Sequence, residues 1–173
     1  ASVERLRWAL LASARPVDFA AHAQGAGLLQ AQHAWALLTS HEKPPALLVK
    51  GAVDSALSSL LMPPHVGRGT YLRNAESLPA NFRVAVRRLD GPSSPVTVGL
   101  RWRAADDVFR SVAQIDLPLD TDVSVDVTVN GTAAGFYSAV LAIIDPRAGT
   151  VWNLSLHVVV IGEDLTTTSR STA

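Results

Sequence analysis

The sequence predicts a mainly β protein, an antiparallel β-sandwich preceded by two helices. From residue 67 onward, apolar and polar residues alternate along several short runs, as they do in strands with one face buried. Turn-forming residues separate these runs, whereas residues 1–43 have apolar side chains at helical spacing. Hydrophobic residues make up 48% of the 173 residues, enough for a folded core.

The first 43 residues predict two helices. Ser2 can cap the first helix, which Pro16 ends, and the second begins after Gly27 and ends before Pro44. The spacing of the second helix puts four residues on one face: Ala31, Ala34, Trp35 and Leu38. Two short helices cannot bury their apolar stripes against each other alone, so we expect a larger body beside them.

Strands are predicted wherever the period is two. Residues 123–129 alternate most regularly, with valines expected inward and Ser, Asp and Thr outward. The other expected strands are residues 70–73, 82–87, 96–103, 136–144 and 151–161. Residues 44–66 are expected to be a linker that holds a short strand at 47–49 and a brief helix at 53–61. Polar residues at 164–173 predict a disordered tail.

Charge and cysteine content exclude several classes of function. The 15 basic residues balance 15 acidic ones, which argues against nucleic acid or an anionic membrane as the partner. The pairs Arg87-Arg88 and Arg101-x-Arg103 are interpreted as solvated strand positions. The absence of cysteine excludes disulfides and thiol catalysis, and no apolar run approaches the roughly 20 residues that span a bilayer.

The candidate ligands and binding residues have simpler structural interpretations. His33 and His41 are eight apart, whereas zinc on a helix prefers a spacing of three or four. We therefore expect solvated or packed histidines at His22, His33, His41 and His157. Five acids lack the dense spacing of a calcium loop and are expected to be loop acids: Asp106, Asp107, Asp116, Asp120 and Asp122. Gly25-x-Gly27 lacks the third glycine of a dinucleotide fingerprint, so close backbone packing before a helix explains it.

The tryptophans allow two interpretations. A β-sandwich commonly takes aromatic residues into its core, which is the interpretation that we favour for this set: Trp8, Trp35, Trp102 and Trp152. The alternative is a platform for sugars, which would make the chain a stand-alone adhesion or carbohydrate-binding module. Mutation of Trp102 or Trp152 distinguishes them, because loss of a core residue unfolds the domain and loss of a platform abolishes binding only.

Three motifs carry a resemblance to subtilisin-like serine peptidases. Gly25-x-Gly27-Leu28, within residues 24–35, resembles the turn and helix that close the catalytic domain of that family, and residues 7–14 resemble the preceding helix. Arg68-Gly69-Thr70-Tyr71-Leu72-Arg73 is similar to the Arg-Gly-Ile-Tyr-Leu-Arg strand of tripeptidyl peptidase II-like members, with Thr70 in place of isoleucine. Residues 135–140, followed by Asp145 and Gly149, resemble a hairpin of the immunoglobulin-like domain behind that catalytic domain.

The resemblance implies an organisation and a role. Residues 1–43 would be the last helices of a truncated catalytic domain, 44–66 a linker, and 67–163 an immunoglobulin-like or fibronectin-like sandwich. The sandwich would support the upstream catalytic domain and assembly, with homo-oligomerisation left open. The family implies a cytoplasmic location, and secretion stays open as well. The first residue is Ala1, which favours a segment cut from a longer protein.

The catalytic triad of that family is not expected in this chain. It needs an aspartate before Thr-Gly, a histidine in His-Gly-Thr-His and a serine in Gly-Thr-Ser. Asp120-Thr121-Asp122 lacks the glycine, His65-Val66-Gly67 lacks the second histidine, and each Gly-Thr pair is followed by another residue than serine. We therefore predict no catalytic residue, no cofactor-binding residue and no metal ligand, and a chain that is inactive alone.

Overall fold

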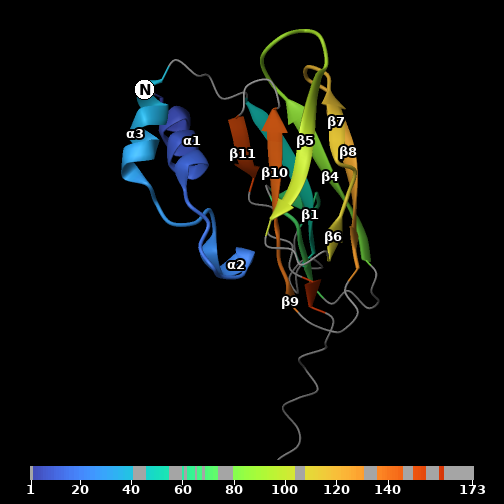
Figure 1. The fold of residues 1–173 in the computed structure, drawn as a ribbon. Helices are drawn as coiled ribbons and strands as arrows, with labels where there is room; N and C mark the ends of the chain where they lie inside the picture. Colours follow the sequence, from blue (N-terminus) through green and yellow to red (C-terminus); the bar gives the residue numbers. More distant parts are fainter. Residues whose placement is uncertain are drawn as a thin grey trace, which may run out of the picture.

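A computed structural model of the 173-residue chain shows a β-sandwich with a helical segment beside it (Figure 1). It describes residues 2–40, 46–54, 60, 62–64, 66–67, 69–73, 80–103, 108–130, 136–145, 150–154 and 160–161. The predicted tail at 164–173 lies outside these residues. No helix in the described part is long and apolar enough to cross a membrane.

The helical segment contains α1 (Val3–Ser13), α2 (Ala21–Gln24) and α3 (Ala31–Thr39). The Ser2 hydroxyl accepts a hydrogen bond from the Arg5 backbone N–H at 3.2 Å, which confirms the predicted cap. α1 ends at Ser13, before Pro16, as expected. The short α2 was not predicted, because four residues are too few to show a helical period.

The larger sheet joins strands from most of the chain. Its order is β6-β8-β4-β1-β3-β12-β9, and β2 pairs with β1 beside this path. The strands are β6 (Phe109–Arg110), β8 (Asp122–Val129), β4 (Ala80–Arg88), β1 (Leu47–Asp54), β3 (Tyr71–Arg73), β12 (Val160–Ile161), β9 (Phe136–Tyr137) and β2 (Val66–Gly67). Within it, β3 is parallel to β1 and β12, and the other pairs are antiparallel.

The second sheet is antiparallel and has the order β11-β10-β5-β7. Its strands are β11 (Thr150–Leu154), β10 (Val140–Asp145), β5 (Val96–Arg103) and β7 (Gln114–Leu117). Figure 1 shows the helical segment on the β11 side of the sandwich, and α1 contacts β11. A mainly antiparallel β protein with helices at its N-terminus is therefore confirmed.

The core lies between the two sheets and follows the predicted alternation. On β8, Val125, Val127 and Val129 are buried, while Ser124 and Asp126 are exposed. The register of β4 against β8 faces valine with valine, at Val84↔Val125 and Val86↔Val123. The second sheet adds the following buried residues: Val96, Val98, Ile115, Leu117, Leu141 and Ile143; Ala139, just before β10, belongs to the same cluster. These side chains form one cluster, as a sandwich with two apolar inner faces requires.

The segment expected to be a linker needs correction. Residues 47–54 of the predicted linker 44–66 form β1, which pairs with β4 from Leu47 to Gly51. The predicted helix at 53–61 is wrong at Val53 and Asp54, which are strand residues, and residues 55–59 lie outside the described part. The short strand predicted at 47–49 is confirmed, and its continuation to Asp54 was missed because a short apolar run has no clear period. The predicted boundaries of residues 1–43 and 67–163 stay predictions.

Candidate functional site

The helical segment exposes large apolar side chains and buries small ones. Among its described side chains, the buried ones are all alanines: Ala9, Ala14, Ala21 and Ala34. Seven larger apolar side chains are exposed, and together we call them the helical apolar surface: Val3, Leu6, Leu11, Phe19, Leu28, Leu29 and Trp35. The fully buried positions of the segment are therefore small, and larger apolar side chains such as Leu10, Leu37 and Leu38 are only half-buried.

Trp35 corrects a prediction about the second helix. The sequence put Trp35 on the packed face with Ala34, but Ala34 is 5% exposed and Trp35 is 67% exposed. α1 and α3 contact each other, and the small side chains let the two helices approach closely. Since successive residues of a helix are about 100° apart, the residue after a packed alanine turns away from the partner helix.

The turn before α3 explains the two glycines of Gly25-x-Gly27. Arg15 and Leu28 form an antiparallel bridge, with N–H to O distances of 2.9 and 2.8 Å. A Cβ on Gly27 would lie 2.8 Å from the Arg15 carbonyl carbon, so close packing is confirmed there. At Gly25 the expectation is wrong, because nothing lies within 4 Å of a Cβ and only the φ of +59° favours glycine.

Two buried nitrogens of α1 have no hydrogen-bond partner within the described part. They are Arg5 Nε and Trp8 Nε1. Arg5 is tied to the end of α3, because its Nη2 donates to the Ser40 carbonyl oxygen. Polar groups of this kind are stabilised when a partner supplies an acceptor.

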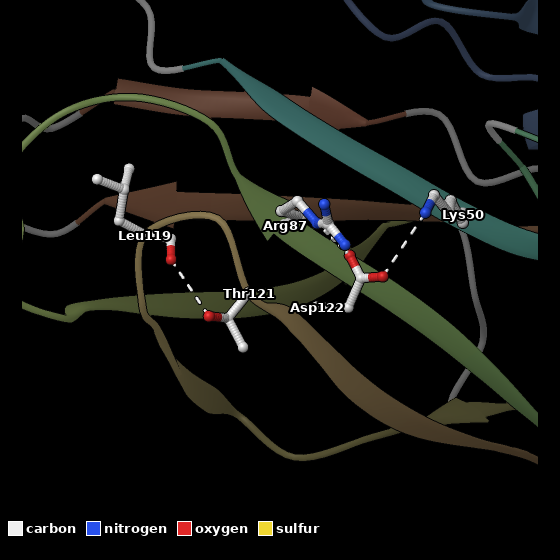
Figure 2. Close-up of polar contacts among 5 residues, drawn as sticks. All are labelled: Lys50, Arg87, Leu119, Thr121 and Asp122. Atoms are coloured by element: carbon white, nitrogen blue, oxygen red, sulfur yellow. Dashed lines mark hydrogen bonds and ion pairs between the residues drawn. The ribbon is translucent and has the colours of Figure 1, made fainter.

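The outer face of the larger sheet carries paired charges. Figure 2 shows Lys50 of β1 and Arg87 of β4 directed toward Asp122 of β8. Arg87 Nε lies 2.6 Å from Asp122 Oδ1, and Lys50 Nζ lies 3.6 Å from Asp122 Oδ2. Further along β4, Arg83 Nε donates to Asp126 Oδ1 at 2.7 Å. These five residues form what we call the charge ladder.

The charge ladder shifts pKa values but leaves little net charge on this face. The hydrogen bond from Arg87 is the main cause that lowers the pKa of Asp122, and the charges of Arg87 and Lys50 act in the same direction. The pKa of Arg83 and that of Arg87 are raised by their carboxylate partners. Because these pairs face solvent, they stabilise the fold only weakly.

Arg88 corrects the prediction that both members of the Arg87-Arg88 pair are solvated. Arg88 is 2% exposed and donates only to carbonyl oxygens among the described residues. Its Nε donates to Leu117 at 3.1 Å, and Nη1 to Asp90 at 2.7 Å. Its Nη2 donates to Pro92 at 2.8 Å and Ser94 at 2.9 Å. We call Arg88 and these four acceptors the Arg88 cluster.

A signal in the sequence could have identified Arg88. The even-numbered residues Phe82, Val84 and Val86 of β4 face the core, and a period of two places residue 88 on the same side. An arginine at such a position needs acceptors inside the fold. The turn that follows β4 supplies three of these acceptors as backbone carbonyls, and Leu117 of β7 supplies the fourth.

The structure does not bring the candidate metal ligands of the sequence together where it describes them. Asp116 accepts a hydrogen bond from the Thr97 hydroxyl at 2.6 Å, and Asp122 belongs to the charge ladder. His33 is exposed on α3. The following lie outside the described side chains: His22, His41, His65, Asp106, Asp107 and His157. Within the described residues, no three His, Asp or Glu side chains could hold a metal ion.

Trp102 packs against the core of the sandwich. Its ring stacks on Phe109 with centroids 5.3 Å apart and planes at 25°, and its Nε1 donates to Ser111 Oγ at 3.1 Å. Trp102 is half-buried against the core cluster. Trp8 is also half-buried, whereas the side chain of Trp152 lies outside the described part. This environment favours the core interpretation of Trp102 over a sugar platform.

The fold defines a class, an immunoglobulin-like β-sandwich built from two sheets. A family model described as "Ig-like domain in actinomycete serine proteases" matches residues 48–161. The match covers more than half of the chain, and the chain belongs to this family. The protease-associated part of the sequence resemblance is thereby confirmed, and the family suggests a non-catalytic accessory domain of a protease.

The other comparisons add little. No curated protein matches the chain. Among solved structures, the crystal structure of a FixG-related protein from Vibrio parahaemolyticus is similar, with a TM-score of 0.42 and 5% identity. The similarity covers 71% of this chain and 100% of that one. A similarity at this level carries no argument about fold or function.

Proposed function

We propose that the chain is a non-catalytic portion of a subtilisin-like serine peptidase. In this proposal the sandwich supports a linked catalytic domain, and residues 1–43 are the last helices of that domain. The observation that carries the proposal is the helical apolar surface, which directly precedes an Ig-like domain of a protease-associated family.

The physical argument rests on the way that the helical segment is packed. Val3 is 83% exposed, Phe19 is 69% exposed and Trp35 is 67% exposed, although burial of each such side chain would contribute about 1.5–3 kcal/mol. Soluble domains rarely expose large contiguous apolar patches unless another surface covers them, and the proposal takes these side chains as parts of one such patch. Among the described residues, the buried Arg5 Nε and Trp8 Nε1 also have no hydrogen-bond partner, which supports a neighbour that supplies acceptors.

The resemblance supplies the identity of that neighbour. Gly25-x-Gly27-Leu28 and the helix after it are similar to the end of a subtilisin-like catalytic domain. In such a domain these helices lie against the catalytic body, which would cover the helical apolar surface. Peptide hydrolysis, of the tripeptidyl-peptidase type in this proposal, then belongs to the linked domain.

Support for the tripeptidyl peptidase II-like subgroup comes from residues 68–73. Thr70 is fully buried, and the similar motif has isoleucine at this position. A buried β-branched residue suits both sequences. The proposed role in assembly and the cytoplasmic location rest on this subgroup resemblance alone.

The test uses the 173-residue chain alone and the same chain in its parent protein. The coding sequence upstream of Ala1 should encode Gly-Thr-Ser, preceded by His-Gly-Thr-His and Asp-Thr-Gly. We expect no peptide hydrolysis by the chain alone and an active parent. Trp35→Gln should leave the melting temperature of the lone chain unchanged and lower that of the parent, with the exposed Arg101→Gln as the matched control.

Two results would overturn the proposal. One is peptidase turnover by the lone chain that persists after Ser2→Ala and Ser13→Ala. The other is a parent gene without the triad motifs, which would leave a stand-alone binding or structural domain.

A further inference from the structure

Ala46 is the first described residue of the sandwich after the helical segment, and both of its peptide groups are held. Its N–H donates to Asp90 Oδ1 at 2.9 Å, and its carbonyl oxygen accepts from the Leu89 N–H at 2.8 Å. One hydrogen bond on each side of the Cα fixes two peptide planes and hence the direction of the chain at this residue. The acceptor for the N–H is a side chain of the turn after β4, 44 residues away in the sequence.

Asp90 can serve as a fixed acceptor because the Arg88 cluster holds its backbone. Arg88 Nη1 donates to the Asp90 carbonyl oxygen at 2.7 Å, and Nη2 secures the turn further on at Pro92 and Ser94. Arg88 is itself fixed on its other side, since its carbonyl oxygen accepts from the Asp120 N–H at 2.8 Å. The carboxylate of Asp90 is thus presented from a rigid turn toward the start of β1.

We propose that Asp90, held by Arg88, is a positioning residue that sets the direction in which the chain leaves the sandwich toward the helical segment. Besides the contact of α1 with β11, the chain continues into the sandwich at Ala46, where free rotation about φ and ψ would let its direction vary. The hydrogen bond to Asp90 removes that freedom. The anchor, defined as Ala46, Leu89 and Asp90, therefore limits the range of orientations between residues 2–40 and the sandwich. This inference goes beyond the proposed function and does not depend on a protease domain.

The experiment measures orientation in the full 173-residue chain. The chain has no cysteine, so spin labels can be attached to Gln32→Cys on α3 and Ser124→Cys on β8, both exposed positions. The distance distribution between the labels is recorded by pulsed electron paramagnetic resonance for the labelled chain with Asp90 and for the same chain with Asp90→Ala. Amide exchange at Ala46 is measured in the same proteins without labels.

Two variants serve as controls. Asp90→Asn keeps an oxygen acceptor for the Ala46 N–H. Asp116→Ala removes an exposed acid that accepts from Thr97 on the second sheet and does not touch Ala46. Both variants should keep the distance distribution of the labelled chain with Asp90.

We expect a single narrow distance distribution in the labelled chain with Asp90 and a broader one in Asp90→Ala. The Ala46 amide should exchange about tenfold faster in Asp90→Ala, as expected for loss of one hydrogen bond to a charged acceptor. A broad distance distribution in the labelled chain with Asp90 would overturn the proposal. An unchanged distribution width and an unchanged Ala46 exchange rate in Asp90→Ala would overturn it as well, and so would equal broadening in Asp116→Ala. If Asp90→Ala fails to fold, Asp90→Glu replaces it, and an unshifted mean distance in that variant overturns the proposal.

Discussion

Replacement of Arg88 by methionine tests whether the hydrogen bonds of this buried arginine stabilise the sandwich. The variant keeps most of the apolar stem that is buried with the arginine, but it removes all four hydrogen bonds to the carbonyl oxygens of Leu117, Asp90, Pro92 and Ser94. A hydrogen bond to a charged group contributes about 1.5–3 kcal/mol net. The turn at 89–95 is exposed, so its carbonyl oxygens can bind water once the arginine is lost. The contributions of the four hydrogen bonds therefore do not simply add.

We therefore expect Arg88→Met to lower the free energy of unfolding by about 3–5 kcal/mol. For a chain of this size, this corresponds to a fall in melting temperature of about 10 °C. Urea denaturation followed by tryptophan fluorescence gives the free energy, and calorimetry gives the melting temperature. Arg88→Lys should recover only part of the loss, since an ammonium cannot reproduce the planar fork of donors.

Arg101→Met is the matched control, because Arg101 is exposed on β5. It should change the free energy of unfolding by no more than about 0.5 kcal/mol. A cost below about 1 kcal/mol for Arg88→Met would refute the reasoning. The Arg88 cluster would then be a consequence of the turn and not a cause of its conformation.

The other predictions concern the turn before α3 and the charge ladder. Gly27→Ala should cost at least about 2 kcal/mol locally, and more than Gly25→Ala, because only Gly27 combines a positive φ with a Cβ position that overlaps the Arg15 backbone. Faster amide exchange at Arg15 and Leu28 reports the loss, and a milder effect than that of Gly25→Ala would contradict it. The lowered pKa of Asp122 contributes stability above the pKa of the unfolded chain and loses it as the pH falls below about 4. Asp122→Asn should flatten this part of the profile of melting temperature against pH, and an unchanged acid slope would argue against the Arg87–Asp122 pair as its source.

The sequence predicted the strands in which apolar and polar residues alternate, because one face of such a strand packs in the core. β8 is the clearest case, since its valines alternate with Ser, Asp and Thr and need no knowledge of β4 to be read correctly. The cap at Ser2 is equally local, because the acceptor and the donor are three residues apart. β1 is different: the sequence predicted only residues 47–49 of it, and pairing with β4, which is distant in the sequence, extends to Gly51.

The candidate surfaces also divide into features visible in the local sequence and features that depend on long-range contacts. The helical spacing of Ala34 and Trp35 is visible in the sequence, but which of the two faces α1 depends on how closely the helices approach. The sequence resemblance predicted an Ig-like domain associated with a serine protease, and the family model that matches residues 48–161 confirms this part of it. The charge ladder was hidden, since its members come from β1, β4 and β8.

The class of this protein follows from its sequence without knowledge of any long-range contact. Alternation fixes which side of a strand is apolar, Pro16 ends the first predicted helix, and the second ends before Pro44. The alternation along β4 places the adjacent Arg87 and Arg88 on opposite faces, and long-range packing decides what each side chain meets. One meets a carboxylate in solvent, and the other meets four carbonyl oxygens inside the fold. Those acceptors come from segments up to 29 residues away, and folding must bring them to the end of β4 before the buried charge is stabilised.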